Sequence, residues 1–239
     1  MERTLNKDTN KQIGKEVVIK GWVNARRNMG KIAFVDLRDR TGLIQVVLVP
    51  AELDETSQKL LPELRPEYVL EIKGVVNERG EKQKNPDQVT GNIEVLAKEV
   101  KVLAAAETLP YELGSEIHMD TYLDNLPFNL RADKYKAIFK VQAALVRGFR
   151  AYMNEKDFTE FQCPKLVACA TEGGANVFTV DYFKNKAFLA QSPQFYKQKL
   201  VSVYERVFSV GNVYRAEAFD TNRHTTEYTS LDFEMGFIK

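Results

Sequence analysis

Short apolar runs alternate with turn-forming residues in the N-terminal part of the sequence. The runs lie at residues 17–23, 32–35, 43–48, 68–72 and 93–96, and Gly30, Gly42, Gly74 and Gly91 punctuate them. Runs of this length and composition, bounded by glycine, predict five β-strands. A short helix is predicted over residues 53–61. Five strands and one helix are the count expected of a small closed barrel of the OB-fold kind.

The pattern changes beyond residue 104. Between residues 105 and 130 the periodicity breaks down around Pro110 and Pro127, which is typical of a hinge or linker. From 133 to 156 apolar residues recur at helical spacing and predict one long amphipathic helix. Strands are predicted over residues 158–162, 178–180, 187–190, 207–210 and 231–237, with a helix over 192–203. We therefore expect three parts: a barrel (1–104), a linker (105–130) and an α+β part (131–239).

Composition excludes several classes of protein. The chain has 239 residues, 44% of them hydrophobic, and a formal net charge of +1. No apolar run approaches the length of about 18 residues that spans a bilayer, so we expect a cytoplasmic protein without a membrane partner. The cysteines are Cys163 and Cys169, and the histidines are His118 and His224. These few ligands predict neither a zinc site nor a disulfide framework.

A net charge near zero creates no global field for nucleic acid, so any RNA contact must come from a local patch. Arg26, Phe34, Arg38 and Gln45 lie on or beside predicted strands of the barrel. An aromatic ring beside guanidinium and amide groups suits single-stranded RNA, because an unstacked base can lie on the ring while its edge is read by hydrogen bonds. A solvated basic face with Phe34 in the core is the alternative.

Four short segments near the end of the chain carry candidate chemistry. They read QSPQFYKQ at 191–198, VYRAE at 213–217, RH at 223–224 and DFE at 232–234. An exposed hairpin with cross-strand ion pairs could contain such residues by itself. In this order and spacing, however, the segments resemble the amino-acid pocket and the ATP loop of class II aminoacyl-tRNA synthetases, most closely the aspartyl-tRNA synthetases.

This resemblance implies an aspartate site made of Glu172, Ser192, Gln194, Lys197, Arg215 and Asp232. Lys197 would pair with the side-chain carboxylate of aspartate, and Gln194, Glu172 and Asp232 would hold the substrate ammonium. Asparaginyl enzymes carry a glutamate in place of this lysine. Aspartate is therefore the expected substrate, because a neutral amide would leave Lys197 buried and unpaired. Glu234 is expected to support other side chains.

The resemblance also implies an ATP site made of Arg215, Glu217, Arg223, His224, Thr225 and Tyr228. Arg215 would be the catalytic residue, because a planar cation can bridge the α-phosphate and the attacking carboxylate. Glu217 would read the adenine amino group, Tyr228 would lie against adenine, and Arg223 and His224 would meet the outer phosphates. Most ligands of the accompanying Mg²⁺ are expected beyond this chain, and no metal site is expected within it.

The resemblance implies functions for two further segments. The turn at residues 171–174 would close over the amino acid, with Gly173 and Gly174 as its hinge, although most such turns are simply turns. The helix and strand between residues 133 and 164, which end at Pro164, would form a homodimer interface. An ordinary core helix followed by a strand is the alternative.

In the barrel, the resemblance implies that Phe34 stacks on the central anticodon base, with Gln45 and Arg26 contacting neighbouring groups. The predicted function is thus ligation of aspartate to its tRNA, with charging of the asparagine tRNA left open. The chain ends at Lys239, before the last ATP-binding segment of the family, so a truncated synthetase with little activity of its own is expected. A non-catalytic tRNA-binding protein and a ligase of the asparagine synthetase type are the alternatives.

Overall fold

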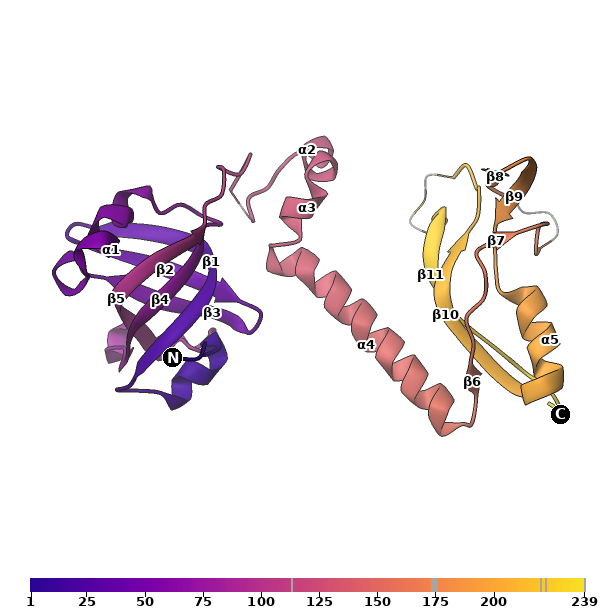
Figure 1. Ribbon diagram of the computed structural model, residues 1–239, viewed down its shortest axis with the longest axis horizontal. Coiled ribbons are helices and arrows are strands. Elements are labelled where there is room, and N and C mark those ends of the chain that lie inside the picture. Colours follow the sequence, from indigo (N-terminus) through magenta and orange to yellow (C-terminus); the bar gives the residue numbers. More distant parts are fainter. Residues whose placement is uncertain (113, 173–175, 220, 222, 239) are drawn as a thin grey trace. The chain divides into compact units, whose positions relative to one another are not determined.

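The computed structural model describes residues 1–112, 114–172, 176–219, 221 and 223–238. The chain divides into two compact units, Met1–Ser115 and Glu116–Lys239 (Figure 1). Among the described residues, no helix is both long enough and apolar enough to cross a membrane. Each unit has its own sheet structure.

The first unit is a closed five-stranded barrel with the order β1-β2-β3-β5-β4 (Figure 1). Its strands are β1 (Glu16–Met29), β2 (Ile32–Asp39), β3 (Gly42–Leu48), β4 (Val69–Glu78) and β5 (Ile93–Ala104). β3 and β5 pair in parallel, whereas the other neighbours pair antiparallel. The predicted OB-fold barrel is confirmed, and its strands extend further than the apolar runs indicated.

Alternating side chains fill the interior of the barrel. Ile19, Val35, Leu37, Ile44 and Ile72 have no exposed surface, whereas the residues between them along each strand are partly or fully exposed. This period of two directs one face of each strand into the core. Because burial stabilises by about 25 cal/mol per Å² of apolar surface, the interior supplies the main driving force for folding of this unit.

Short helices connect the barrel strands: η1 (Asn6–Lys11), η2 (Pro50–Glu52), α1 (Glu55–Leu60), η3 (Leu61–Glu63) and η4 (Glu81–Gln83). Asp54 caps α1, since its Oδ1 accepts a hydrogen bond from Ser57 N at 2.9 Å. Hydrogen bonds from Ser57 lower the pKa of Asp54. The cap satisfies a backbone donor that the first turn of a helix leaves unpaired.

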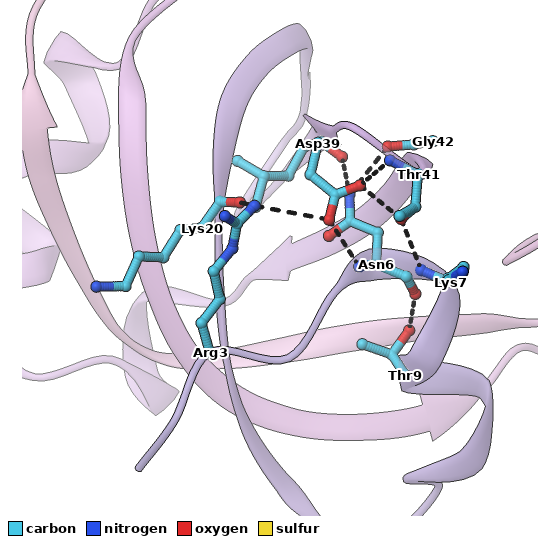
Figure 2. Close-up of polar contacts among 9 residues, drawn as sticks. Arg3, Asn6, Lys7, Thr9, Lys20, Asp39, Thr41 and Gly42 are labelled. Carbon is cyan, nitrogen blue, oxygen red and sulfur yellow. Dashed lines mark hydrogen bonds and ion pairs between the residues drawn. The ribbon is translucent and has the colours of Figure 1, made fainter. Parts of the chain in front are cut away.

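The N-terminal segment is fastened to the turn between β2 and β3 by buried polar contacts (Figure 2). The Asp39 carboxylate accepts hydrogen bonds from the backbone N–H of Asn6 at 2.9 Å and of Thr41 at 2.7 Å. The Asn6 side-chain amide donates to the carbonyls of Leu37 and Gly42. Asn6 has no exposed surface, so these bonds compensate the loss of hydration of its N–H donors, whereas its Oδ1 is buried without a partner among the described residues.

The second unit combines helices with two three-stranded sheets, ordered β11-β10-β6 and β7-β9-β8. Its helices are α2 (Met119–Asp124), α3 (Leu126–Asn129), α4 (Asp133–Glu155) and α5 (Gln194–Tyr204). Its strands are β6 (Thr159–Glu160), β7 (Leu166–Val167), β8 (Thr179–Tyr182), β9 (Asn185–Leu189), β10 (Arg206–Tyr214) and β11 (Glu227–Met235). The predicted long helix is confirmed as α4, while the region predicted to be linker contains α2 and α3.

Helix α4 contacts one face of the β10–β11 hairpin. The rings of Phe149 and Phe208 meet edge to face with centroids 5.7 Å apart, and Gln142 Nε2 lies 3.5 Å from Thr229 Oγ1. Other apolar side chains of α4 remain exposed; Ile138, Val141 and Leu145 are each at least 58% exposed. Phe149 thus packs on the hairpin, and a stripe made of Ile138, Val141 and Leu145 faces solvent within this chain.

Candidate functional site

The two faces of the β10–β11 hairpin have different characters. Phe208 pairs with Phe233 on the face that α4 contacts, and Ser209 pairs with Asp232 on the opposite face. Because side chains alternate along a strand, Tyr228, Asp232 and Glu234 all belong to this second face. Helix α5 packs against both strands of the hairpin. Of the residues predicted for the aspartate site, Lys197 of α5 and Asp232 of β11 come together between these two elements.

Lys197 of α5 lies at the centre of this polar face. Its Nζ is 2.5 Å from Asp232 Oδ1 and 3.4 Å from Glu234 Oε2. The Lys197 and Asp232 side chains are only 10% and 20% exposed, so charge-assisted hydrogen bonding replaces much of their hydration. Asp232, which was expected to help orient the substrate ammonium, pairs with Lys197 in this structure.

Buried polar residues shape the start of α5. Ser192 is 9% exposed, and its Oγ accepts a hydrogen bond from Gln194 N at 3.3 Å. Gln191 is 1% exposed, and its Oε1 accepts one from Glu172 N at 3.2 Å. These contacts connect the turn that carries Glu172 to the segment that leads into α5. Gly173 and Gly174, the predicted hinge, lie outside the described residues.

Arg215 follows the last residue of β10 and pairs with the opposite charge of Glu172. Arg215 Nη2 donates to Glu172 Oε2 at 3.0 Å, and the two side chains are 34% and 32% exposed. The Nε of Arg215 is buried and has no hydrogen-bond partner among the described residues. A buried donor without a partner is costly, so this nitrogen is suited to an acceptor that a ligand supplies.

The other residues predicted to bind ATP are more open. Arg223, His224 and Thr225 are exposed, and His224 Nδ1 is 2.7 Å from Thr221 Oγ1. Glu217 is half-buried, while Tyr228 is 39% exposed and lies opposite Val213 on the hairpin. The hairpin thus offers an accessible aromatic face, with cations and a carboxylate in the connection between its strands.

On the barrel, Phe34 and Gln45 occupy neighbouring strands and are both half-buried. Phe34 lies opposite Arg27 of β1, and Gln45 lies opposite Asp36 of β2. The Arg27 guanidinium donates from Nη2 to Gln45 Oε1 at 3.2 Å and to Asp36 Oδ1 at 3.0 Å. An aromatic ring, an amide and a guanidinium therefore meet on one outward face of the barrel.

Arg26, predicted to join this face, is turned elsewhere. Its Nη1 donates to the carbonyls of Pro62 at 3.3 Å and Leu64 at 2.8 Å. A register shift between Val23 and Ala25 moves the alternation of β1 by one residue, so that Arg27 stands opposite Phe34. Arg27 was not predicted as an RNA-binding residue from the sequence, because its place opposite Phe34 depends on the strand register.

Within the described residues, no three His, Cys, Asp or Glu side chains come close enough together to hold a metal ion between them. Cys163 and Cys169 are both free thiols. The described part of the site contains cations, carboxylates, amides and an aromatic ring.

Comparison with known protein families agrees with this arrangement. Residues 118–239 match the family described as tRNA synthetases class II (D, K and N), and residues 17–103 match the OB-fold nucleic acid binding domain. The chain belongs to the class II tRNA synthetases of this D, K and N group. Within that group it is a homologue of the aspartate–tRNA(Asp/Asn) ligases.

Several curated relatives carry that name. The Thermus thermophilus protein is 45% identical over 99% of this chain and 53% of its own length. The Deinococcus radiodurans protein is 42% identical over 100% of this chain and 52% of its own length. The chain thus spans about half the length of the curated relatives it matches.

Solved structures share the same architecture. The asparaginyl-tRNA synthetase of Pyrococcus horikoshii, complexed with asparaginyl-adenylate, matches with a TM-score of 0.85 and 30% identity, over 95% of this chain and 51% of that chain. The aspartyl-tRNA synthetase of Entamoeba histolytica matches with a TM-score of 0.80 and 26% identity, over 100% and 51% respectively. An OB-fold barrel followed by part of a class II synthetase domain is therefore the fold of this chain.

Proposed function

We propose that this chain carries out the recognition steps of an aspartate–tRNA ligase: it selects L-aspartate, activates it with ATP to aspartyl-adenylate, and binds tRNA through the barrel. The observation that carries the proposal is the buried ammonium of Lys197 on the face that β11 shares with α5. Aspartyl-adenylate formation and transfer to tRNA are the reactions that this assignment requires.

Lys197 selects the substrate side chain in this account. An ammonium has three donors, and Asp232 and Glu234 lie near enough to use two of them. A substrate carboxylate takes the remaining donor or replaces Glu234, the more distant carboxylate. A neutral amide in the same place accepts a hydrogen bond from Lys197 without forming an ion pair, and it gains less than a carboxylate does. Asparagine is therefore rejected more strongly than its size alone would explain.

Arg215 acts at the reacting atoms. When the substrates bind, Arg215 leaves Glu172 and contacts the α-phosphate and the substrate carboxylate. Its unpaired Nε supplies an additional donor. Glu172, once released, pairs with the substrate ammonium, together with Gln194 and Asp232, while Ser192 supports Gln194. Fixed cations of this kind stabilise the charge that builds up as the carboxylate attacks.

The connection between β10 and β11 binds the nucleotide. Tyr228 offers its partly exposed ring to adenine, and Glu217 accepts from the adenine amino group. Arg223, His224 and Thr225 meet the outer phosphates, where exposed cations and hydroxyls can follow a flexible ligand. Reactions of this class use Mg²⁺, and no step assigned to this chain passes through the metal.

The barrel supplies the RNA-binding surface. Phe34 stacks on the central anticodon base, Gln45 reads the edge of a base, and Arg27, which shares the outward face, binds beside them. Arg26 retains the proposed role of a neighbouring contact only if RNA draws it away from the carbonyls of Pro62 and Leu64.

The exposed stripe of α4 is proposed to pair with a second copy of the protein. Ile138, Val141 and Leu145 form this stripe between residues 133 and 164, and Pro164 follows at the end of the region. An apolar surface of this kind marks an interface more often than a solvated face.

Exchange of labelled pyrophosphate into ATP tests the enzymatic proposal. Exchange by this chain is expected to be weak, and to depend on aspartate and not on asparagine. A Lys197→Glu variant removes the cation and should abolish the exchange, whereas Lys199→Glu on the exposed side of the same helix should preserve it. Absence of aspartate-dependent exchange by the wild-type chain would refute adenylate formation and leave RNA binding by the barrel as the function.

A further inference from the structure

Both ends of the Gln45 amide are engaged on the outward face of the barrel. Its Oε1 accepts from Arg27 Nη2 at 3.2 Å, and its Nε2 donates to Glu94 Oε2 at 2.9 Å. Arg27, Gln45 and Glu94 come from β1, β3 and β5. The amide is therefore held by side chains from two other strands.

These partners permit one orientation of the amide. If the oxygen and nitrogen of Gln45 exchanged places, the oxygen would face the Glu94 carboxylate and the NH₂ group would face the Arg27 guanidinium. Acceptor would then face acceptor and donor would face donor. In the observed orientation, one lone pair of the oxygen and one hydrogen of the nitrogen are left for a ligand. A fixed pair of one acceptor and one donor is what reading a base edge requires.

Arg79 lies behind Glu94 at the end of β4. Its Nε donates to the carbonyl of Ile93 at 2.8 Å and lies 3.9 Å from Glu94 Oε2, the oxygen that accepts from Gln45. The Arg79 side chain is 6% exposed and that of Glu94 is 21% exposed. Arginine is seldom buried to this extent unless it is paired. The position of Arg79 beside the carboxylate thus determines where Glu94 accepts the hydrogen bond from the Gln45 amide.

Charge holds the arrangement together. Burial lowers the pKa of Arg79, whereas the charges of Glu94 and Asp36 raise it. The guanidinium remains protonated in proteins, so Arg79 is a permanent cation beneath the face. Removing it would leave the Glu94 carboxylate partly buried without its nearest cation, and the carboxylate would turn toward solvent.

We infer that Arg79 is a positioning residue for base recognition: it holds Glu94 where the carboxylate orients the Gln45 amide, while its own burial keeps it from the RNA. This inference rests on the proposed function, in which Gln45 reads a base of the anticodon. Arg79 acts through Glu94 and affects which base is accepted. It does not affect how strongly the RNA backbone is bound.

Binding of RNA hairpins tests the inference. The probes are an anticodon hairpin with the sequence GUC and hairpins in which each anticodon base is changed singly. A Gln45→Ala variant of the full chain defines the base that Gln45 reads, as the position at which discrimination is lost. Wild type should discriminate at that position by about tenfold or more.

Arg79→Met should lose most of this discrimination at the same base and retain it at the others. Its affinity should keep the salt dependence of wild type, because a residue that touches no phosphate releases no counterion. Lys101→Met, which removes an exposed charge from β5, is the matched control and should discriminate like wild type. Discrimination unchanged in Arg79→Met would overturn the inference. So would uniform weakening with a lower salt slope, which would mean that Arg79 contacts the backbone directly.

A second measurement does not need RNA and also covers the case in which Arg79→Met fails to fold. In Arg79→Gln, which removes the cation but keeps a side-chain donor for the carbonyl of Ile93, the NMR signals of the Gln45 side-chain NH₂ should move toward those of Glu94→Ala. Signals unchanged from wild type would overturn the inference. Failure of wild type to bind any hairpin would instead refute the proposed role of the barrel, and the inference with it.

Discussion

The ammonium of Lys197 and the carboxylate of Asp232 lie 2.5 Å apart between α5 and β11, in side chains that are 10% and 20% exposed. The pair connects α5 to β11, the helix and the strand that carry Lys197 and Asp232 of the proposed aspartate site. It therefore contributes to packing of the unit and also sets the charge that a ligand meets.

Lys197→Met should destabilise the second unit. The change leaves Asp232 and Glu234 close together without their shared cation, at an expected cost of about 2–3 kcal/mol. Urea unfolding monitored by circular dichroism measures it. Lys199→Met, on an exposed position of the same helix, should change the free energy of unfolding by less than about 0.5 kcal/mol. Equal effects of the two substitutions would contradict a specific role for the pair.

The barrel contains an even more buried ion pair. Arg38 Nη2 lies 2.8 Å and 3.1 Å from the two carboxylate oxygens of Glu67, and the side chains are 13% and 5% exposed. Arg38→Met should cost about 3 kcal/mol, because it leaves a buried carboxylate without its cation. Adding Glu67→Gln to Arg38→Met should restore part of that loss. A double variant less stable than Arg38→Met would show that the two residues are not coupled as the geometry indicates.

Two glycines should respond in opposite directions to alanine. A Cβ at Gly74 would lie 2.3 Å from the carbonyl oxygen of Leu96, whereas a Cβ at Gly148, inside α4, meets no atom within 4 Å. Gly74→Ala should destabilise the barrel by about 1–3 kcal/mol through overpacking. Gly148→Ala should stabilise its helix by about 0.5–1 kcal/mol. Thermal unfolding of each variant compares them, and a tolerated Gly74→Ala would contradict the close approach of β4 and β5.

Long periodic segments could be predicted from the sequence. The apolar spacing that predicted a helix over residues 133–156 corresponds to α4, and the five apolar runs of the N-terminal part correspond to the barrel strands. In contrast, β7 was missed, because its two residues are too few for any periodicity. β6 lies within the strand predicted over residues 158–162. Helices α2 and α3 were also missed, because Pro127 suggested a linker although proline is tolerated in the first turn of a helix.

The site was harder to predict, because it depends on strand register. Without the shift between Val23 and Ala25, Arg26, which was expected to contact the RNA beside Phe34, would stand opposite Phe34. The bulge places Arg27 there, and no local feature of the sequence marks it. The pairing of Lys197 with Asp232 joins residues that are 35 positions apart, so the order of motifs could indicate that both matter but not that they touch.

Calorimetric binding of adenylate analogues tests the central claim most directly. Aspartyl-sulfamoyl-adenosine should bind the chain about tenfold or more tightly than asparaginyl-sulfamoyl-adenosine, because the aspartyl carboxylate meets the ammonium of Lys197. Lys197→Met should remove that preference, and Lys199→Met should keep it. Equal affinities of the wild-type chain for the two analogues would contradict selection of aspartate by Lys197.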